Sequence, residues 1–198
     1  MGDNSAFFYG TLMAREVLYR VIYGHEELTP VTTILASKLT HTPAILHNHC
    51  RHKVLHDDYP GVIPQEGHFV RGVYVTGLTD ADIYRLDIFE GDEYTRVKAT
   101  VKLLVHDGGT EVEGEEASTE TYIFTASESR LEKAEWDYEE FRREKMWRWA
   151  GTSKEYDEEV DAAAAAATSN GSYDPTGGRG IFAGPGKKEQ QEALENAD

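Results

Sequence analysis

The chain has 198 residues, of which 28% are charged and 39% are hydrophobic. This length predicts about one domain with a short remainder, and the hydrophobic content supports one core, which excludes a wholly disordered chain. The net charge of −16 speaks against a nucleic-acid-binding protein, because neutralising phosphates requires clustered Lys and Arg. The single cysteine, Cys50, excludes an internal disulfide framework.

No stretch of the sequence approaches the roughly 18 apolar residues of a membrane span. The start MGDNSAFFYG has neither the basic region nor the apolar core of a signal peptide, and Ala6 stands where a myristoylation signal has Ser or Thr. We therefore expect a cytoplasmic protein without a membrane partner. Most of the negative charge lies after residue 105, which indicates a solvated surface.

The N-terminal third predicts strands around one helix. Residues 6–9 form a short apolar run that leads through Gly10 into a helix over 13–23, which Gly24 would end. The β-branched and alternating residues of 31–42 and 44–55 predict two strands. A turn at Asp58-Tyr59-Pro60-Gly61 follows, and then a strand over 68–76.

A short helix is expected next, because Thr79 followed three residues later by Asp82 is typical of a helix start, and Gly91 of a helix end. Two strands, over 94–105 and 119–125, follow it. The glycine- and glutamate-rich residues between them, 106–118, are too polar for a core and predict a long, exposed hairpin loop.

The C-terminal third predicts a helix and a tail. Ser129 with Glu132 resembles a capping box, and apolar residues recur at helical spacing up to Gly151. Beyond it come six alanines and many turn-forming residues. We expect a domain over 1–152 and, over 153–198, a short Ala-rich helix with a flexible Gly-rich tail. The fold class is α+β, with six or seven mostly antiparallel strands and two or three helices.

Glu90 is the first candidate for chemistry. It lies four residues after Leu86 and seven after Ile83, so on a helix it projects from the same face as these apolar residues. Burial and the negative helix end at Gly91 would both raise the pKa of its carboxyl group, which is typical of a general acid/base. The alternative is a helix that ends one residue earlier and leaves Glu90 to swing out or to pair with Arg96.

The junction at Tyr9-Gly10-Thr11-Leu12 is the second candidate. A buried strand, a glycine and a helix start place several backbone N–H groups at the edge of the core, where they can bind a carboxylate or a polarised carbonyl oxygen. Such junctions also occur simply as packing solutions.

A histidine-rich stretch is the third candidate. In a strand its side chains divide between the two faces, and no spacing matches a zinc finger, so we predict no metal site. Structural and surface roles are favoured for the histidines, and Cys50 is expected to be a small buried residue. The stretch contains six potential ligands: His41, His47, His49, Cys50, His52 and His56.

Three motifs lie in order along the chain: YGTL at 9–12, YPGV at 59–62 and LDIFEGDEYTR at 86–96. Together they resemble the gamma-glutamylcyclotransferase superfamily, and in particular its AIG2-like and gamma-glutamylamine cyclotransferase branch. Order, spacing and identity all agree, over roughly residues 6–125. The resemblance implies a small mixed, mostly antiparallel β-barrel flanked by helices.

The resemblance also implies an activity and its residues. Enzymes of this kind cyclise a gamma-glutamyl group to 5-oxoproline, an acyltransferase reaction that releases an amine or amino acid from a small-molecule substrate and needs no cofactor. The family's acid/base glutamate matches Glu90, and its substrate-binding loop matches Tyr9, Gly10, Thr11 and Leu12. Tyr94 resembles a tyrosine that borders the same cavity.

Two other hypotheses about the function remain open from the sequence. A barrel of the same shape could be a non-catalytic module that binds a small ligand or a protein, although such a scaffold needs neither the YGTL sequence nor an inward glutamate. The histidine-rich stretch could instead bind a metal. Neither the oligomeric state nor the leaving amine follows from the sequence.

Overall fold

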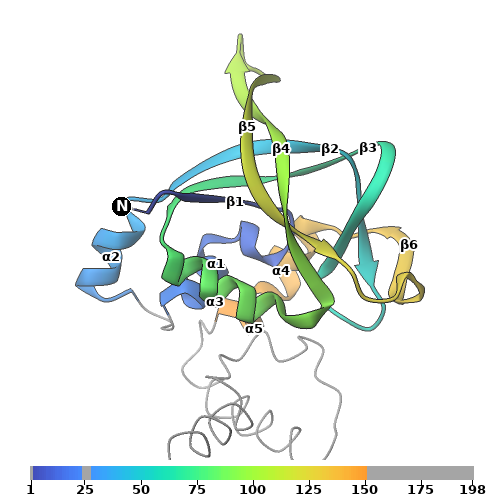
Figure 1. Cartoon of the computed structure of the whole chain (residues 1–198), viewed down its shortest axis with the longest axis horizontal. Coiled ribbons are helices and arrows are strands. Elements are labelled where there is room, and N and C mark those ends of the chain that lie inside the picture. Colours follow the sequence, from blue (N-terminus) through green and yellow to red (C-terminus); the bar gives the residue numbers. More distant parts are fainter. Residues whose placement is uncertain (1, 24–27, 151–198) are drawn as a thin grey trace, which may run out of the picture.

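Five strands close around a common core, and a sixth extends the sheet, in the part of the chain that the computed structural model describes, residues 2–23 and 28–150 (Figure 1). The order is β3-β1-β5-β4-β2-β6, and β2 also pairs with β3, so the sheet returns on itself. Among the strands that the structure describes, only β1 and β5 pair in parallel. The predicted mixed, mostly antiparallel barrel is confirmed. The strands are β1 (Asn4–Phe8), β2 (Thr40–Val54), β3 (Pro60–Leu78), β4 (Tyr94–Asp107), β5 (Thr110–Phe124) and β6 (Leu131–Glu135).

Strand β1 lies inside this closed arrangement, between β3 and β5, and its end positions the pocket described below. Its residues Ala6, Phe7 and Phe8 are almost wholly buried. At Gly72 of β3, a Cβ atom would lie 2.3 Å from the carbonyl oxygen of Phe8. Only glycine therefore permits the close approach of β3 to the end of β1.

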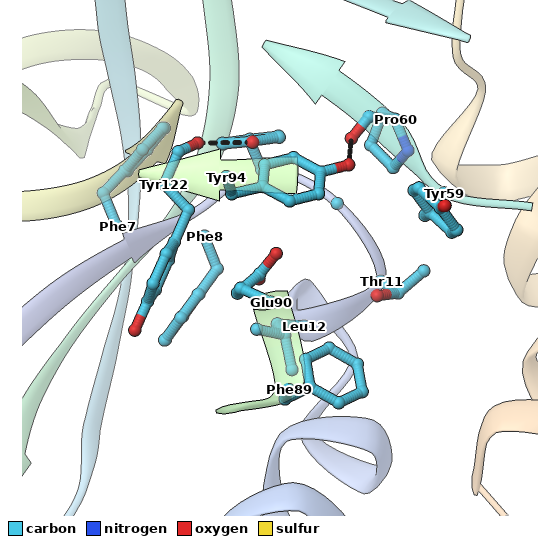
Figure 2. Close-up of a pocket in the computed structure, with 12 residues that line it drawn as sticks. Phe7, Phe8, Thr11, Leu12, Tyr59, Pro60, Phe89, Glu90, Tyr94 and Tyr122 are labelled. Carbon is cyan, nitrogen blue, oxygen red and sulfur yellow. Dashed lines mark hydrogen bonds between the residues drawn. The ribbon is translucent and has the colours of Figure 1, made fainter. Parts of the chain in front are cut away.

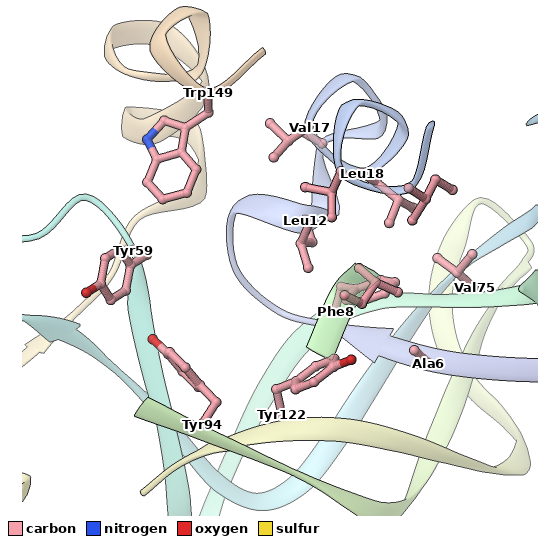
Figure 3. Close-up of a cluster of buried hydrophobic side chains, with 14 of the residues drawn as sticks. Ala6, Phe8, Leu12, Val17, Leu18, Tyr59, Val75, Tyr94, Tyr122 and Trp149 are labelled. Atoms are coloured by element: carbon pink, nitrogen blue, oxygen red, sulfur yellow. The ribbon is translucent and has the colours of Figure 1, made fainter. Parts of the chain in front are cut away.

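The helices gather mainly on one side of the sheet, where α1, α3, α4 and α5 lie together (Figure 1). Their apolar residues, with those of the sheet, form the core shown in part in Figure 3. No helix among the described residues is both long and apolar enough to cross a membrane. The helices are α1 (Arg15–Tyr23), α2 (Pro30–Ala36), α3 (Asp80–Glu90), α4 (Tyr138–Glu144) and α5 (Met146–Ala150). Three 3₁₀ turns accompany them: η1 (Thr11–Met13), η2 (Gly91–Glu93) and η3 (Glu128–Arg130).

Helix α3 begins and ends where the sequence predicts. The Thr79 hydroxyl accepts a hydrogen bond from the Asp82 N–H at 3.2 Å, and the Asp82 carboxylate accepts one from the Thr79 N–H at 2.8 Å. This reciprocal capping satisfies two N–H groups that have no acceptor within the helix. Gly91 ends the helix with a φ of +60°, a conformation that glycine adopts readily. Glu90 is thus the last residue of α3, and an earlier end is excluded.

The predicted strand over 31–42 is wrong in its first part, which forms α2. The Thr29 hydroxyl accepts a hydrogen bond from the Thr32 N–H at 3.2 Å and caps the helix. Pro30 occupies the first helical position, where its missing N–H costs nothing. These local signals outweigh the β-branched residues. The strand begins only at Thr40 and continues through the predicted second strand as β2.

Residues 106–118 form an exposed hairpin connection, as predicted, but most of them are in strands rather than in a loop. Strands β4 and β5 continue as a two-stranded ribbon to a turn at Gly108 and Gly109, both of which have positive φ angles. The ribbon projects beyond the rest of the sheet (Figure 1). Because solvent surrounds it, alternation of apolar and polar residues is not needed there, and its polar composition gives no strand signal.

The predicted helix over 129–151 is replaced by η3, β6, α4 and α5. Residues of β6 pair with β2, at Val54 opposite Leu131 and His52 opposite Glu135. Backbone pairing with an existing strand therefore overrides the helical spacing. The helical part begins at Asp137, whose carboxylate accepts hydrogen bonds from two N–H groups of α4, at 2.8 and 3.0 Å. The described part of the chain has five α-helices rather than two or three. Gly24 and the predicted tail over 153–198 lie outside the described residues.

Candidate active site

A pocket opens where the end of β1, the start of β3, the last turn of α3 and strands β4 and β5 meet (Figure 2). Including its open mouth, the hollow has a volume of about 360 Å³. It brings together the segments that carry the three sequence motifs. Its lining consists of Phe7, Phe8, Tyr9, Gly10, Thr11, Leu12, Tyr59, Pro60, Phe89, Glu90, Tyr94 and Tyr122.

Glu90 extends from the last turn of α3 into the middle of these side chains, with its carboxylate toward Tyr94 (Figure 2). Ile83 and Leu86, on the same face of the helix, are 7% and 0% exposed. The inward projection that the spacing predicts is therefore confirmed. The carboxylate lies among mostly aromatic walls.

The turn over 9–12 forms the wall beside Glu90. The Gly10 carbonyl accepts the first hydrogen bond of η1, from the Met13 N–H at 3.0 Å. The N–H groups of Gly10, Thr11 and Leu12 come before that bond, so the turn gives them no acceptor. A Cβ atom at Gly10 would lie 2.9 Å from Cγ of Pro60, so close packing requires glycine here.

Tyr9 and Tyr94 brace the backbone around the pocket with their hydroxyl groups. The Tyr9 hydroxyl donates to the Tyr122 carbonyl at 2.5 Å, and the Tyr94 hydroxyl donates to the Pro60 carbonyl at 2.9 Å. Both hydrogen bonds are buried. Buried carbonyl groups without a partner cost free energy, so these bonds hold the walls in one arrangement.

A polar network holds the last turn of α3. Asp87 accepts two hydrogen bonds from the Arg96 guanidinium, at 2.8 and 3.2 Å, and one from the Tyr122 hydroxyl at 2.8 Å. Arg96 also pairs with Glu120. Burial, the hydrogen bond to Asp87 and the charge of Glu90 all raise the pKa of Tyr122, which stays protonated. Asp87 precedes Glu90 by about one helical turn, so the network holds the turn of α3 from which Glu90 projects.

Sequence reasoning missed this network and found only Arg96 as a possible partner of Glu90. Asp87 and Arg96 both lie within the third motif, nine residues apart. That spacing joins a helix to a strand and has no local signature. Only the pairing of β4 with β5 brings Tyr122 to the same place, as Arg96 lies opposite Tyr122.

Helix α5 packs against two of the residues that line the pocket. The Trp149 ring lies edge-on to the Tyr59 ring (Figure 3) and to the Phe89 ring, and the ring centroids are 6.2 Å apart in both pairs. The buried Asp58 carboxylate accepts from Lys145 at 2.8 Å and from Arg148 at 3.5 Å. Since Tyr59 and Phe89 line the pocket, α5 supports two of its walls from behind.

The histidine-rich stretch lies in β2 and the turn after it, away from the pocket lining. His47 bonds to Glu113 at 2.9 Å, and the His52 ring bonds to the Glu132 carbonyl at 3.0 Å. His41 lies beside Tyr19, and burial, with the charge of Arg15, lowers the pKa of His41 to about 4. Within the described residues no group of three or more His, Cys, Asp or Glu side chains is placed to hold a metal ion.

Comparison with known proteins gives the family. Residues 6–147 match the model of the family described as gamma-glutamyl cyclotransferase, AIG2-like. The fold and the pocket agree with the motifs that predict this family, and the match spans most of the chain. The protein therefore belongs to the AIG2-like gamma-glutamyl cyclotransferase family.

Several relatives come from Arabidopsis thaliana. Protein AIG2 C is 30% identical over 122 residues, which cover 61% of this chain and 70% of the relative. Protein AIG2 B is 30% identical over 136 residues, which cover 68% of this chain and 76% of the relative. AIG2-like protein D is 28% identical over 159 residues, which cover 80% of this chain and 91% of the relative. These names state no reaction.

Two solved structures are similar at low identity. A solution structure of an Arabidopsis thaliana protein has a TM-score of 0.48 at 23% identity and covers 78% of this chain and 91% of its own. A structure of a gamma-glutamyl cyclotransferase has a TM-score of 0.44 at 15% identity and covers 98% of both chains.

Proposed function

We propose that the protein cyclises the gamma-glutamyl group of a small molecule to 5-oxoproline and releases an amine or amino acid. The observation that carries this proposal is the position of Glu90, whose carboxylate reaches the centre of a pocket walled by the turn over 9–12. Family membership supports the same reaction. A binding module that holds a small ligand needs no carboxylate at that point.

The reaction is an intramolecular acyl transfer. The α-amino nitrogen of the substrate attacks its own γ-carbonyl carbon, which forms the new C–N bond of a five-membered ring. The bond from that carbon to the leaving amine then breaks. Glu90 first removes one proton from the α-ammonium group and then returns it to the leaving nitrogen. After attack the ring nitrogen carries one proton more than the product amide, and this second proton passes to the released amine, which leaves as an ammonium ion, so protons and charge balance. The nucleophile belongs to the substrate, so neither a covalent enzyme intermediate nor a metal ion is required.

The pocket supplies the other requirements of this reaction. In the proposal, the N–H groups of Gly10, Thr11 and Leu12 hold the glutamyl group and the oxygen that becomes negative during attack. Aromatic rings, including those of Phe89 and Tyr94, displace water and fold the substrate toward Glu90. Because Tyr9 and Tyr94 use their hydroxyls on backbone carbonyls, we assign them to the walls rather than to proton transfer.

Glu90→Gln tests the proposal. The amide keeps the shape of the side chain but cannot accept the proton, so 5-oxoproline release should fall by about two to four orders of magnitude. The assay uses a panel of gamma-glutamyl amines, gamma-glutamyl amino acids and glutathione. Glu139→Gln is the matched control, because that side chain is 72% exposed on α4. It should keep wild-type turnover.

Three results are informative. Release that requires Glu90 supports the mechanism and identifies the substrate class. Wild-type turnover in Glu90→Gln overturns the acid/base assignment. If the wild-type protein, correctly folded, releases no 5-oxoproline from any member of the panel, the activity proposal fails for these substrates and the non-catalytic binding module becomes the better explanation.

A further inference from the structure

Arg51 lies just behind the turn over 9–12 and contacts its backbone. Its side chain, on β2, is only 11% exposed. One terminal nitrogen donates to the Tyr9 carbonyl at 2.9 Å and lies 3.4 Å from the Arg71 carbonyl. The other donates to Glu135 at 3.1 Å, and the guanidinium lies 5.5 Å from the centre of the Trp136 ring.

The direction of this contact matters for Gly10. The described residues contain no cis peptide bond, so the peptide that joins Tyr9 to Gly10 is trans. In a trans peptide the C=O and the following N–H point in opposite directions. Tyr9 and Gly10 line the pocket and Arg51 does not. A carbonyl that points back toward Arg51 therefore turns the Gly10 N–H toward the pocket.

We propose that Arg51 is a positioning residue that fixes the Tyr9–Gly10 peptide, so that the Gly10 N–H donates to the γ-carbonyl oxygen of the substrate as that oxygen becomes negative. This role rests on the proposed cyclisation. Arg51 does not touch the substrate. It acts through one peptide group.

Charge supports the same role. Among the described residues that line the pocket there is no lysine or arginine. The positive charge of a guanidinium strengthens its hydrogen bond to a carbonyl and polarises that peptide, which makes the N–H on the other side a better donor. Arg51 thus favours negative charge in the pocket without lining it.

The geometry also calls for arginine rather than lysine. The guanidinium reaches a backbone carbonyl with one nitrogen and Glu135 with the other, while its flat face covers Trp136. An ammonium group cannot make these contacts at the same time in a fixed direction. Arg51→Lys should therefore retain the charge and lose much of the orientation.

Kinetics of three variants test the proposal. Arg51→Met removes the charge and keeps an apolar stem. We expect its kcat to fall about 10- to 100-fold, less than the loss from removing an oxyanion donor outright. KM should change less than about threefold, because the lost interaction belongs to the transition state. The kcat of Arg51→Lys should lie between those of the wild type and Arg51→Met. Arg142→Met, the same change at a half-exposed residue of α4, should match the wild type.

The pH dependence separates positioning from proton transfer. Glu90 is intact in Arg51→Met. The pH at which kcat falls because the catalytic base becomes protonated should therefore be the same as in the wild type, while the maximal kcat is lower. Equal kcat in Arg51→Met and wild type overturns the proposal. If Arg51→Met does not fold, Arg51→Lys carries the same comparison, and a kcat equal to wild type overturns the proposal there too.

An NMR measurement tests Arg51 without turnover. The amide resonance of Gly10, in glycine-labelled protein, should differ between wild type and Arg51→Met. Titration with 5-oxoproline should shift it in the wild type and shift it much less in the variant. Equal responses, or no response in the wild type, overturn the role of Arg51. If the wild type is inactive on the whole panel but Gly10 responds as expected, the cyclisation fails and the positioning of this N–H stands.

Discussion

The surroundings of the pocket and the base of the β4–β5 ribbon use polar groups in opposite ways. Around the pocket, buried donors bond to backbone carbonyls: Tyr9 and Tyr94 do so with their hydroxyls, and the Trp136 indole donates to the Asp58 carbonyl at 2.8 Å. Each of these bonds joins segments far apart in the sequence. Together they fix where the walls stand.

At the base of the ribbon, polar side chains pair with one another at the surface. Lys102 on β4 pairs with Glu116 on β5, and the His47 ring on β2 bonds to Glu113 on β5. Each of these side chains is at least 35% exposed. Water competes for such groups, and holding two long side chains together costs entropy. The number of polar contacts in a region therefore does not measure how much they stabilise it. The stabilisation depends on whether the bonded groups are buried.

The largest effect is expected behind the pocket, for Trp149→Ala. The Trp149 side chain is 1% exposed and supports Tyr59 and Phe89. Its loss leaves a cavity, so the free energy of unfolding should fall by about 3–5 kcal/mol. Urea denaturation measures this.

The control for this change lies two residues away in the same helix. Trp147 is 37% exposed, so Trp147→Ala should change the free energy of unfolding by less than about 1 kcal/mol. Similar losses for both tryptophans would contradict the view that α5 supports the pocket through Trp149.

A smaller and pH-dependent effect is expected at His41. Burial holds the pKa of His41 near 4 in the folded protein, against 6.5 for the unperturbed side chain. Between these two pH values the unfolded chain binds more protons than the folded protein. The contribution of neutral His41 to the free energy of unfolding is therefore complete above pH 6.5 and is lost as the pH falls toward 4. Over that window, unfolding free energy should fall more steeply in wild type than in His41→Gln.

The matched control is His68→Gln, at an exposed position of β3. It should keep the wild-type slope between pH 6.5 and pH 4, the window that the His41 pKa defines. A slope in His41→Gln that equals the wild type would show that His41 is accessible to protonation in the folded state.

The smallest effect is expected on the ribbon, for Glu116→Gln. The Glu116 side chain is 63% exposed, so losing its pair with Lys102 should cost about 0–1 kcal/mol. The difference from wild type should shrink further at high salt. A loss comparable to that of Trp149→Ala would erase the distinction between the two regions.

Local signals in the sequence were sufficient to predict those elements whose formation depends on residues close together in the chain. Thr79 and Asp82 cap a helix by contacts three residues apart, and the spacing from Leu86 to Glu90 sets the direction of the carboxylate. Gly10 follows a buried strand and opens the turn that lines the pocket. The family motifs lie on these same elements, so the candidate site could be predicted.

Other features depend on contacts between distant segments. Residues 131–135 have helical spacing but form β6, because β2 offers them backbone partners. Asp87, Arg96 and Tyr122 meet only because β4 pairs with β5 beside α3. Arg51 reaches the Tyr9 carbonyl across 42 residues of sequence.

The sequence by itself thus determined the class of fold, the family and the candidate acid/base residue, because capping, helical periodicity and short motifs act over a few neighbouring residues. The tertiary structure alone decided what holds that residue and its opposite wall in place. Those contacts join segments whose proximity exists only after the sheet has closed, and no local pattern encodes them.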